Sequence, residues 1–249
     1  MQNIGMPEQL YDSAEITQMR TDLALALRAA DHHGLAEGVC NHFSVALPGV
    51  NDLFLLNPRG LTWAEIQADD IVLVNGQGEP IAGRHEVEPT AMFIHAAIHR
   101  IANKRCVLHT HMPYATALSL TLPGTLDTSL SQNAMRFFDR VVVDERYNGF
   151  AFDSHEGERI ARAMNGADIV FLSNHGVVVC NDRIDYAYDD LYYLERACCT
   201  EVLARSTGLP LRAADKSVAA KVGTQAQNEE GRKQSELFFA ALRRQLSKS

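Results

Sequence analysis

The stretch Cys106-Val107-Leu108-His109-Thr110-His111-Met112 is an apolar run that ends in two histidines separated by one residue. Side chains alternate between the faces of a β-strand, so a strand here would point His109 and His111 to the same side. Two imidazoles on one face are a preset pair of ligands for a divalent metal ion. The alternative is a pair of ordinary histidines near a strand end, because a catalytic zinc site needs three protein ligands.

A third histidine, His175, falls on a predicted turn between two apolar runs, Asp168–Leu172 and Val177–Cys180. Turns at strand ends are common places for functional residues. His175 is far from His111 along the chain, so only folding can bring the two together, and spacing alone does not prove that it does. The alternative is that Asn174-His175-Gly176 is simply a polar turn.

A rival metal-binding pattern is formed by His95 and His99, which are one turn apart on a predicted helix. Zinc-protease helices use such a pair with glutamate directly after the first histidine. Ala96 occupies that position, so the pattern argues against a protease. We expect His95 to pack near the site and His99 to lie on a partly exposed helix face.

The composition is that of a globular protein: 249 residues, 46% hydrophobic and 22% charged, with a net charge of −8. The negative charge argues against a nucleic-acid or anionic-membrane surface. The N-terminus lacks a basic segment followed by an apolar run, and no stretch reaches the roughly 18 apolar residues of a membrane span. The five cysteines form no C-x-x-C pair and indicate buried thiols in a reducing cytoplasm.

The order of predicted elements favours one domain. Residues 1–14 are expected to be a loose leader, residues 15–206 the domain, and residues 207–249 a helical extension that packs on a neighbouring subunit or frays. Within the domain we predict a strand hairpin over residues 38–56, a short helix at Thr62–Glu65, and loops around a strand between residues 125 and 150.

Four motifs occur in the order seen in one family. They are Gly38-x-x-Asn41-His42-x-Ser44, Asn57-Pro58-Arg59-Gly60, His109-Thr110-His111 and Ser173-Asn174-His175-Gly176, and they are followed by a helix with Tyr192-Tyr193-Leu194-Glu195-Arg196-Ala197. Over residues 15–206 the chain resembles the class II aldolase/adducin family, closest to its bacterial adducin-like branch. The resemblance implies a fuculose-phosphate aldolase-like fold: an α/β protein with a three-layer α/β/α sandwich and a mostly antiparallel mixed sheet. It also implies a cytoplasmic homotetramer and supports His109, His111 and His175 as metal ligands.

The resemblance extends to residues that contact substrate and move protons. The sugar-phosphate aldolases of the family carry a glutamate four residues before the histidine that corresponds to His95, where this chain has Ala91. The candidate proton donors are Glu88, Tyr114, Tyr192 and Tyr193, of which we assign Glu88 and Tyr192. A carboxylate at position 88 also fits simple helix-start electrostatics. The implied substrate-binding residues are Asn41, His42, Ser44, Arg59, Gly60 and Asn174.

These features predict a divalent-metal-dependent carbon–carbon lyase that acts on a small hydroxy-carbonyl or hydroxy-carboxylate substrate. Three imidazoles favour Zn²⁺, with Mn²⁺ or Co²⁺ as alternatives. A metal that stabilises an enediolate would serve retro-aldol cleavage and decarboxylation equally, so the pattern does not choose between them. The alternative function is a non-catalytic binding module, similar to the adducin head, with a vestigial metal site.

Overall fold

The computed structural model describes residues 7–50, 52–149 and 154–246. An eight-stranded sheet forms its centre, in the order β4-β3-β2-β1-β5-β8-β7-β6. Every neighbouring pair is antiparallel except β6 and β7, which run parallel. The strands are β1 (His42–Ala46), β2 (Leu53–Leu56), β3 (Val72–Asn75), β4 (Pro80–Ala82), β5 (Cys106–Thr110), β6 (Val141–Asp144), β7 (Ile169–Leu172) and β8 (Gly176–Asn181). This is the mostly antiparallel mixed sheet that the resemblance implied.

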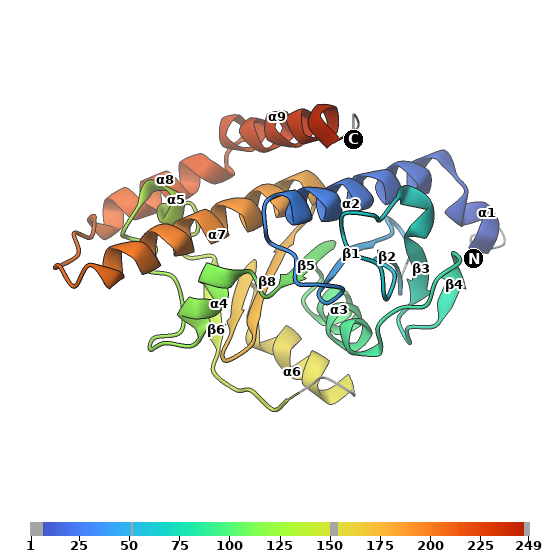
Figure 1. Ribbon diagram of the computed structural model, residues 1–249, viewed down its shortest axis with the longest axis horizontal. Coiled ribbons are helices and arrows are strands. Elements are labelled where there is room, and N and C mark those ends of the chain that lie inside the picture. Colours follow the sequence, from blue (N-terminus) through green and yellow to red (C-terminus); the bar gives the residue numbers. More distant parts are fainter. Residues whose placement is uncertain (1–6, 51, 150–153, 247–249) are drawn as a thin grey trace.

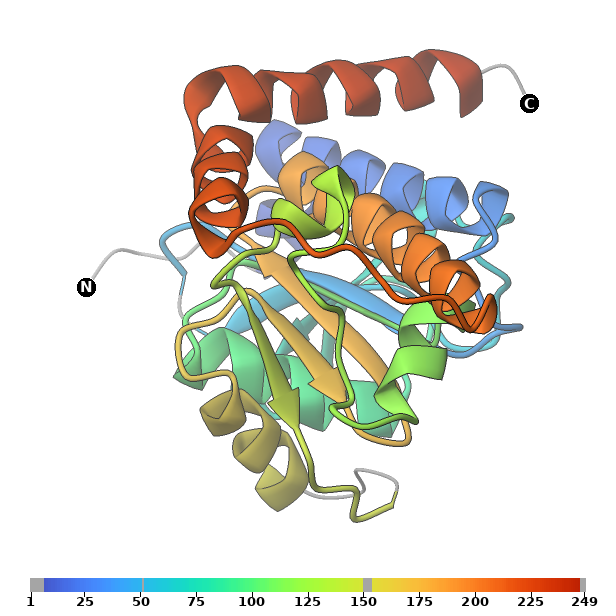
Figure 2. The same cartoon turned by 90° about the vertical axis from the view of Figure 1, so that its left-hand side faces the viewer.

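Helices cover both faces of the sheet (Figure 1). One face carries α3 and α6, and the other carries α2 and α7, with α9 lying outside these two (Figure 2). The helices are α1 (Pro7–Tyr11), α2 (Ala14–His32), α3 (Pro89–Ile101), α4 (Pro113–Ser119), α5 (Gln132–Met135), α6 (Ser154–Ala163), α7 (Ile184–Ser206), α8 (Lys216–Gln227) and α9 (Glu229–Leu246), with a 3₁₀ turn η1 (Ala68–Asp70). The three-layer α/β/α fold is therefore confirmed.

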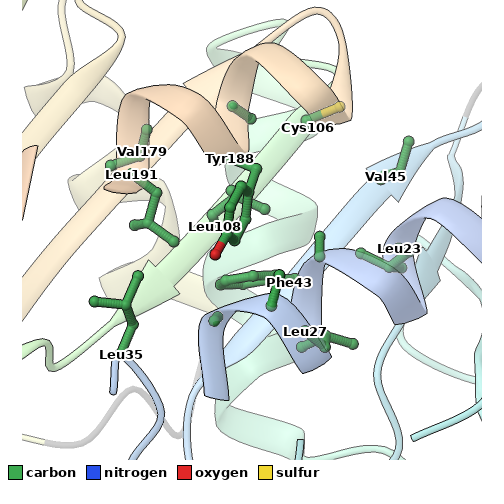
Figure 3. Packing of buried hydrophobic residues seen from close by; sticks show 14 of the residues in the cluster. Leu23, Leu27, Leu35, Phe43, Val45, Cys106, Leu108, Val179, Tyr188 and Leu191 are labelled. Carbon is green, nitrogen blue, oxygen red and sulfur yellow. The ribbon is translucent and has the colours of Figure 1, made fainter. Parts of the chain in front are cut away.

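The main core lies between the sheet and the α2–α7 layer. Phe43 and Leu108 project from adjacent strands toward Leu27 of α2 and Tyr188 of α7, and all four side chains are fully buried (Figure 3). A second core on the other face joins α3 and α6 to alternate strand positions such as Val107. Because successive strand residues point to opposite faces, the same strand supplies both cores. The sheet is thus held rigidly on both sides, which fixes the positions of its strand ends.

Three local expectations differ from the structure. Thr62–Glu65 forms a turn and not a helix: Thr62 N–H bonds the Glu65 carboxylate at 3.1 Å, but the chain leaves the helical path after one turn. The segment between residues 125 and 150 contains a short helix, α5, besides the expected strand. The predicted leader is anchored in its second part, because the Tyr11 hydroxyl donates to Ile71 O at 2.6 Å; residues 1–6 lie outside the described part of the chain.

The C-terminal extension packs on its own chain. Phe239 and Leu242 of α9 are buried, and the ring of Phe238 lies 5.0 Å from that of Tyr192 on α7. Ion pairs also join α9 to the body of the protein, including Arg243 to Asp22 of α2 at 2.5 Å. Up to Leu246 the extension therefore packs against α2 and α7 of its own chain.

Candidate metal centre

The site is built where several strands begin or end at one edge of the sheet. β1 begins at His42, which pairs with His109 near the end of β5. β7 ends at Leu172, which pairs with Gly176 at the start of β8. Antiparallel pairing therefore brings the residues just after β5 and just after β7 to the same edge, although they are far apart in sequence.

His109, His111 and His175 meet at this edge. Their ligand nitrogens all lie within 4.8 Å of one another, and among the described residues they are the group of histidine, cysteine and acidic side chains that could hold a metal ion. The ring centroids are 5.1 Å apart for His109 and His111, and 4.8 Å apart for each with His175. The structure therefore brings together the three predicted ligands: His109 at the end of β5, His111 just after it, and His175 on the turn between β7 and β8.

Hydrogen bonds orient two of the rings for metal binding. His109 Nδ1 donates to Val177 O at 3.0 Å, and His111 Nδ1 donates to the Glu37 carboxylate at 2.5 Å. Each ring is thereby left with a free Nε2 lone pair. His111 Nε2 is buried and has no hydrogen-bond partner among the residues that the structure describes. A buried, unpartnered acceptor is costly unless something binds it, and metal-ligating histidines usually donate their second nitrogen in this way. The residues present therefore fit a divalent ion.

Burial keeps two of the three rings in the protonation state that a metal ion requires. Burial, reinforced by the neighbouring imidazoles, lowers the pKa of His109 well below its usual value. Burial and the nearby His111 lower the pKa of His175 to about 4. Metal ions bind neutral imidazole, so His109 and His175 lose little metal affinity to proton competition at pH 7.

Two further residues fix the loops that carry the ligands. Asn41 Oδ1 accepts a hydrogen bond from the His111 backbone N–H at 3.0 Å. A side chain at Gly176 would place its Cβ 2.5 Å from Thr110 O and 2.8 Å from the His111 ring. Only glycine allows this close approach, so Gly176 is needed for the position of the His111 imidazole.

The residues expected to bind substrate are not all at the surface of this site. Asn41 is buried, and its side-chain oxygen is occupied by His111, as described above. Ser44 is fully buried, and its hydroxyl bonds His95 and His99 at 2.5 and 2.7 Å. The structure therefore does not place Ser44 where a substrate can reach it, because Ser44 points under α3. His42 is partly buried and shares the sheet edge with His109, and Asn174 is exposed beside His175.

The two assigned proton carriers have other partners in the structure. Tyr192 packs in the outer helical layer, where its ring contacts those of His33, Tyr193 and Phe238. Glu88 stands at the N-cap of α3 and bonds the Arg59 guanidinium at 3.0 Å. Arg59 is followed by Gly60 with φ of 81°. Tyr192 thus packs among other aromatic rings, and Glu88 is paired with a cation that was itself expected to bind substrate.

Sequence reasoning missed two residues of the site. Glu37 orients His111 from the loop before β1, and Tyr147 places its ring 6.0 Å from that of His175. His99 is half-buried, in agreement with the partly exposed face expected for it, and it also bonds Ser44. Glu37 and Tyr147 both lie in loops without periodicity, so no pattern distinguished them from surface residues.

Comparison with known proteins identifies the family. A mixed sheet between helical layers, with three histidines at one edge, agrees with the match of residues 21–202 to the Class II Aldolase and Adducin N-terminal domain. The chain belongs to this family.

Its relatives differ in their named activities. A candidate aldolase class 2 protein of Pseudomonas aeruginosa is 33% identical over 82% of this chain and 78% of its own length. Decarboxylase NovR of Streptomyces niveus is 31% identical over 75% of this chain and 70% of its own length. Human β-adducin is 27% identical over 76% of this chain, which corresponds to 26% of the adducin.

Solved structures agree on the fold. An aldolase II superfamily protein from Pseudomonas syringae superposes with a TM-score of 0.87 at 29% identity, covering 97% of this chain and 96% of that one. The L-fuculose 1-phosphate aldolase of Glaciozyma antarctica gives a TM-score of 0.83 at 25% identity, covering 94% and 92%. Coverage this complete includes the C-terminal helices.

Proposed function

We propose that this chain is a divalent-metal-dependent carbon–carbon lyase that acts on a small hydroxy-carbonyl or hydroxy-carboxylate compound. The observation that carries the proposal is the convergence of His109, His111 and His175, whose ligand nitrogens all lie within 4.8 Å of one another. Three imidazoles with open positions are the ligand set of a catalytic zinc site, and Mn²⁺ or Co²⁺ are the alternatives.

The residues of the chain have separable roles in this proposal. His109, His111 and His175 would hold the ion, while Glu37 and the Val177 carbonyl keep two of the rings in the required tautomer. The bound ion would supply Lewis-acid stabilisation of negative charge that develops beside a substrate oxygen. The low pKa of His175, about 4, keeps this ligand neutral through the physiological range.

Substrate would enter beside His175. A hollow in this region is lined by Tyr147, Arg159 and His175. His42, Gly60 and Asn174 are proposed to border the substrate from the strand ends. Arg59 is proposed to bind an anionic group of the substrate, which requires that it exchange its ion pair with Glu88. Asn41 would not contact substrate in this proposal. It would act by holding the backbone N–H of His111.

Two reactions fit the site, because retro-aldol cleavage and decarboxylation both leave negative charge on carbon next to an oxygen. Relatives are named for each, a decarboxylase in Streptomyces niveus and an aldolase in Glaciozyma antarctica. The test is to incubate the Zn²⁺- and Mn²⁺-loaded chain with hydroxy-ketones, sugar phosphates, hydroxy-acids and aromatic carboxylates, and to assay carbonyl products and carbon dioxide. Turnover that disappears in the His109→Ala variant supports the proposal, and no turnover across the panel counts against it.

The second candidate is a binding module, which the likeness to β-adducin favours. A module would retain its partner after the metal ligands are removed, whereas the lyase would lose its activity. Pull-down with the wild-type chain and with the His109→Ala plus His111→Ala variant separates the two. A partner that binds both chains equally, together with no turnover, supports the module.

We further propose that residues 15–206 form the catalytic domain and that the chain works as a cytoplasmic homotetramer. Cysteines 40, 106, 180, 198 and 199 are all free, which fits a reducing compartment. Within the described ranges, no helix combines the length and the apolar character needed to span a bilayer. Light scattering of the purified protein tests the assembly, and a mass near that of the 27.5 kDa monomer would contradict it.

A further inference from the structure

A chain of buried polar groups runs beneath the metal centre between α3 and β1. Ser44 Oγ lies 2.5 Å from His95 Nδ1 and 2.7 Å from His99 Nε2. The other nitrogen of His99, Nδ1, lies 2.7 Å from Lys104 O. Ser44 and His95 are fully buried. Two imidazoles thus meet on one hydroxyl inside the protein.

The positions of the hydrogens follow from one fixed acceptor. A carbonyl oxygen cannot donate, so His99 Nδ1 carries the proton that bonds Lys104 O, and neutral His99 has a bare Nε2. The single Ser44 hydroxyl proton must then point to His99 Nε2. His95 Nδ1 therefore donates to Ser44, and His95 Nε2 is left as a bare lone pair. The Lys104 carbonyl therefore fixes the direction of every hydrogen bond in this series.

The free end of this series of hydrogen bonds is His95 Nε2, on the side of the metal centre. His95 Nε2 is buried and has no hydrogen-bond partner among the described residues. The ring of His42 stands edge-on to that of His95, with centroids 6.1 Å apart and an interplanar angle of 89°. His42 is in turn the strand partner of His109. An unpartnered buried acceptor is costly, and its position between the metal centre and Ser44 indicates a use.

We propose that His95, Ser44 and His99 form a proton relay that takes up a proton beside His42 and holds the charge on His99. This proposal rests on the proposed lyase function and identifies the proton carrier of that reaction. The sequence leaves the carrier open, because position 91 is alanine. His95 is then the group that receives and returns the proton, and Ser44 and His99 act through it.

The transfer balances in three linked steps. An N–H bond forms at His95 Nε2 as His95 Nδ1 gives its proton to Ser44 Oγ. The original Ser44 proton passes to His99 Nε2, so the serine stays neutral. His99 becomes an imidazolium whose Nδ1–H still bonds Lys104 O. The reverse sequence returns the proton to the site, and no oxidant or further reactant is needed.

His99 is the member of the relay that is best placed to hold positive charge. Burial lowers its pKa to about 4, but the hydrogen bond to Lys104 O opposes that effect. For His95, burial and the neighbouring His42 and His99 all lower the pKa, and no hydrogen bond among the described residues opposes them. His99 also borders an open groove beside Lys104 and Arg100. The nearby cations are already neutralised, since Lys104 bonds Asp168 and Arg100 bonds Glu158.

The competing explanation is purely structural: the cluster could simply attach α3 to β1. Both explanations predict a loss of stability when Ser44 is altered, so stability cannot decide between them. Exchange of the buried His95 ring proton with water can. In a relay that proton leaves through Ser44 and His99, whereas in a static cluster it leaves only when the protein opens.

The experiment uses the full chain with ¹⁵N-labelled histidine, metal-free and zinc-loaded. Long-range imidazole spectra at pH 7 should show His95 and His99 both protonated at Nδ1. The His95 ring proton should exchange at least tenfold faster than the backbone amide proton of Val107 on the adjacent strand.

Ser44→Ala should slow this exchange at least tenfold, and Ser44→Thr, which keeps the hydroxyl, should restore it. Ser235→Ala, which removes an equally buried hydroxyl on α9, is the matched control and should change nothing.

Three results would overturn the relay: a proton on His95 Nε2, exchange of the His95 proton no faster than that of Val107, or equal exchange in wild type and Ser44→Ala. The first two need only the wild-type protein, so the relay can be refuted even if Ser44→Ala does not fold. With any substrate that the panel identifies, Ser44→Ala should lower kcat at least tenfold with little change in KM. If no substrate is found, the proposed lyase fails while the exchange data still decide the relay.

Discussion

The carboxylate of Glu37 lies 2.5 Å from Nδ1 of His111. This contact joins the loop before β1 to the end of β5, and it leaves Nε2 of the same ring buried and unpartnered. A carboxylate behind a histidine fixes the tautomer and raises the basicity of the ligating nitrogen. The loop before β1 therefore contributes to metal affinity although it supplies no ligand.

Replacing Glu37 by glutamine should weaken metal binding. Losing the carboxylate behind a ligating histidine typically reduces affinity by about 10–100-fold. Competition with a chromogenic chelator measures the dissociation constant for Zn²⁺. Glu229→Gln removes a charge from distant α9 and should leave the constant unchanged. An equal affinity in Glu37→Gln and wild type would show that the contact has no role in binding.

Metal removal should lower the thermal stability of the protein. A ligand present at 100 times its dissociation constant stabilises the folded state by about 2.7 kcal/mol, which raises Tm by roughly 5–10 °C for a chain of this size. Differential scanning calorimetry with Zn²⁺ and with chelator measures the shift. His175→Ala should abolish the shift, and His32→Gln, a change of an exposed histidine, should preserve it. A shift that survives in His175→Ala would exclude this residue as a ligand.

Gly176→Ala should damage the site more than the fold. The new Cβ would lie 2.5 Å from Thr110 O and 2.8 Å from the His111 ring, so the His111 imidazole must move. Overpacking of this kind costs about 1–3 kcal/mol, and we expect loss of bound metal in addition. Gly166→Ala is the control: its φ of 85° makes alanine strained, but no atom lies within 4 Å. It should lower Tm and keep the metal, as metal analysis by mass spectrometry would show.

The metal-free protein should lose stability in acid through its buried histidines. Burial lowers the pKa of His99 to about 4, whereas in the unfolded chain it is near 6.5. The unfolded state therefore binds more protons between these values. This part of the stability is complete above pH 6.5 and falls as pH decreases toward 4, by up to about 1.4 kcal/mol per pH unit for each such histidine.

Urea denaturation in the presence of chelator, at pH 7, 6 and 5, measures that slope. His42 and His175, whose pKa values are lowered to about 3 and about 4, contribute in the same direction. His99→Gln removes one titrating group and should make the slope shallower. A free energy of unfolding that stays constant between pH 7 and 5 would contradict buried neutral histidines.

The fold was largely predictable because its signals are local or carried by ordered motifs. The hairpin expected over residues 38–56 and the apolar run that begins at Cys106 both form strands, and the helix expected to carry His95 and His99 is α3. The errors lie where local signals are weak. Thr62–Glu65 has the cap of a helix but not its length, and α5 is a single short helix inside a loop-rich segment.

Side-chain roles were harder to predict than ligand identity. Ser44 was expected to face a substrate and instead bonds two histidines under α3, and Tyr192 was expected near the site and instead packs in the outer layer. In both cases the residue type was informative, but the sequence did not reveal the direction of the side chain. That direction depends on which helix covers which face of the sheet.

By itself the sequence determined the residues that can bind a metal ion: a pair on one strand face at His109 and His111, and a third histidine on a turn at His175. Strand periodicity is a local property, so it can be read from the chain. Only the tertiary structure decided that antiparallel pairing of β5, β8 and β7 brings the three together, that Glu37 and Val177 set their tautomers, and that His95 ends in a bare nitrogen beside His42. Those contacts join residues that are remote in sequence, and they exist only once the sheet and its two helical layers have formed.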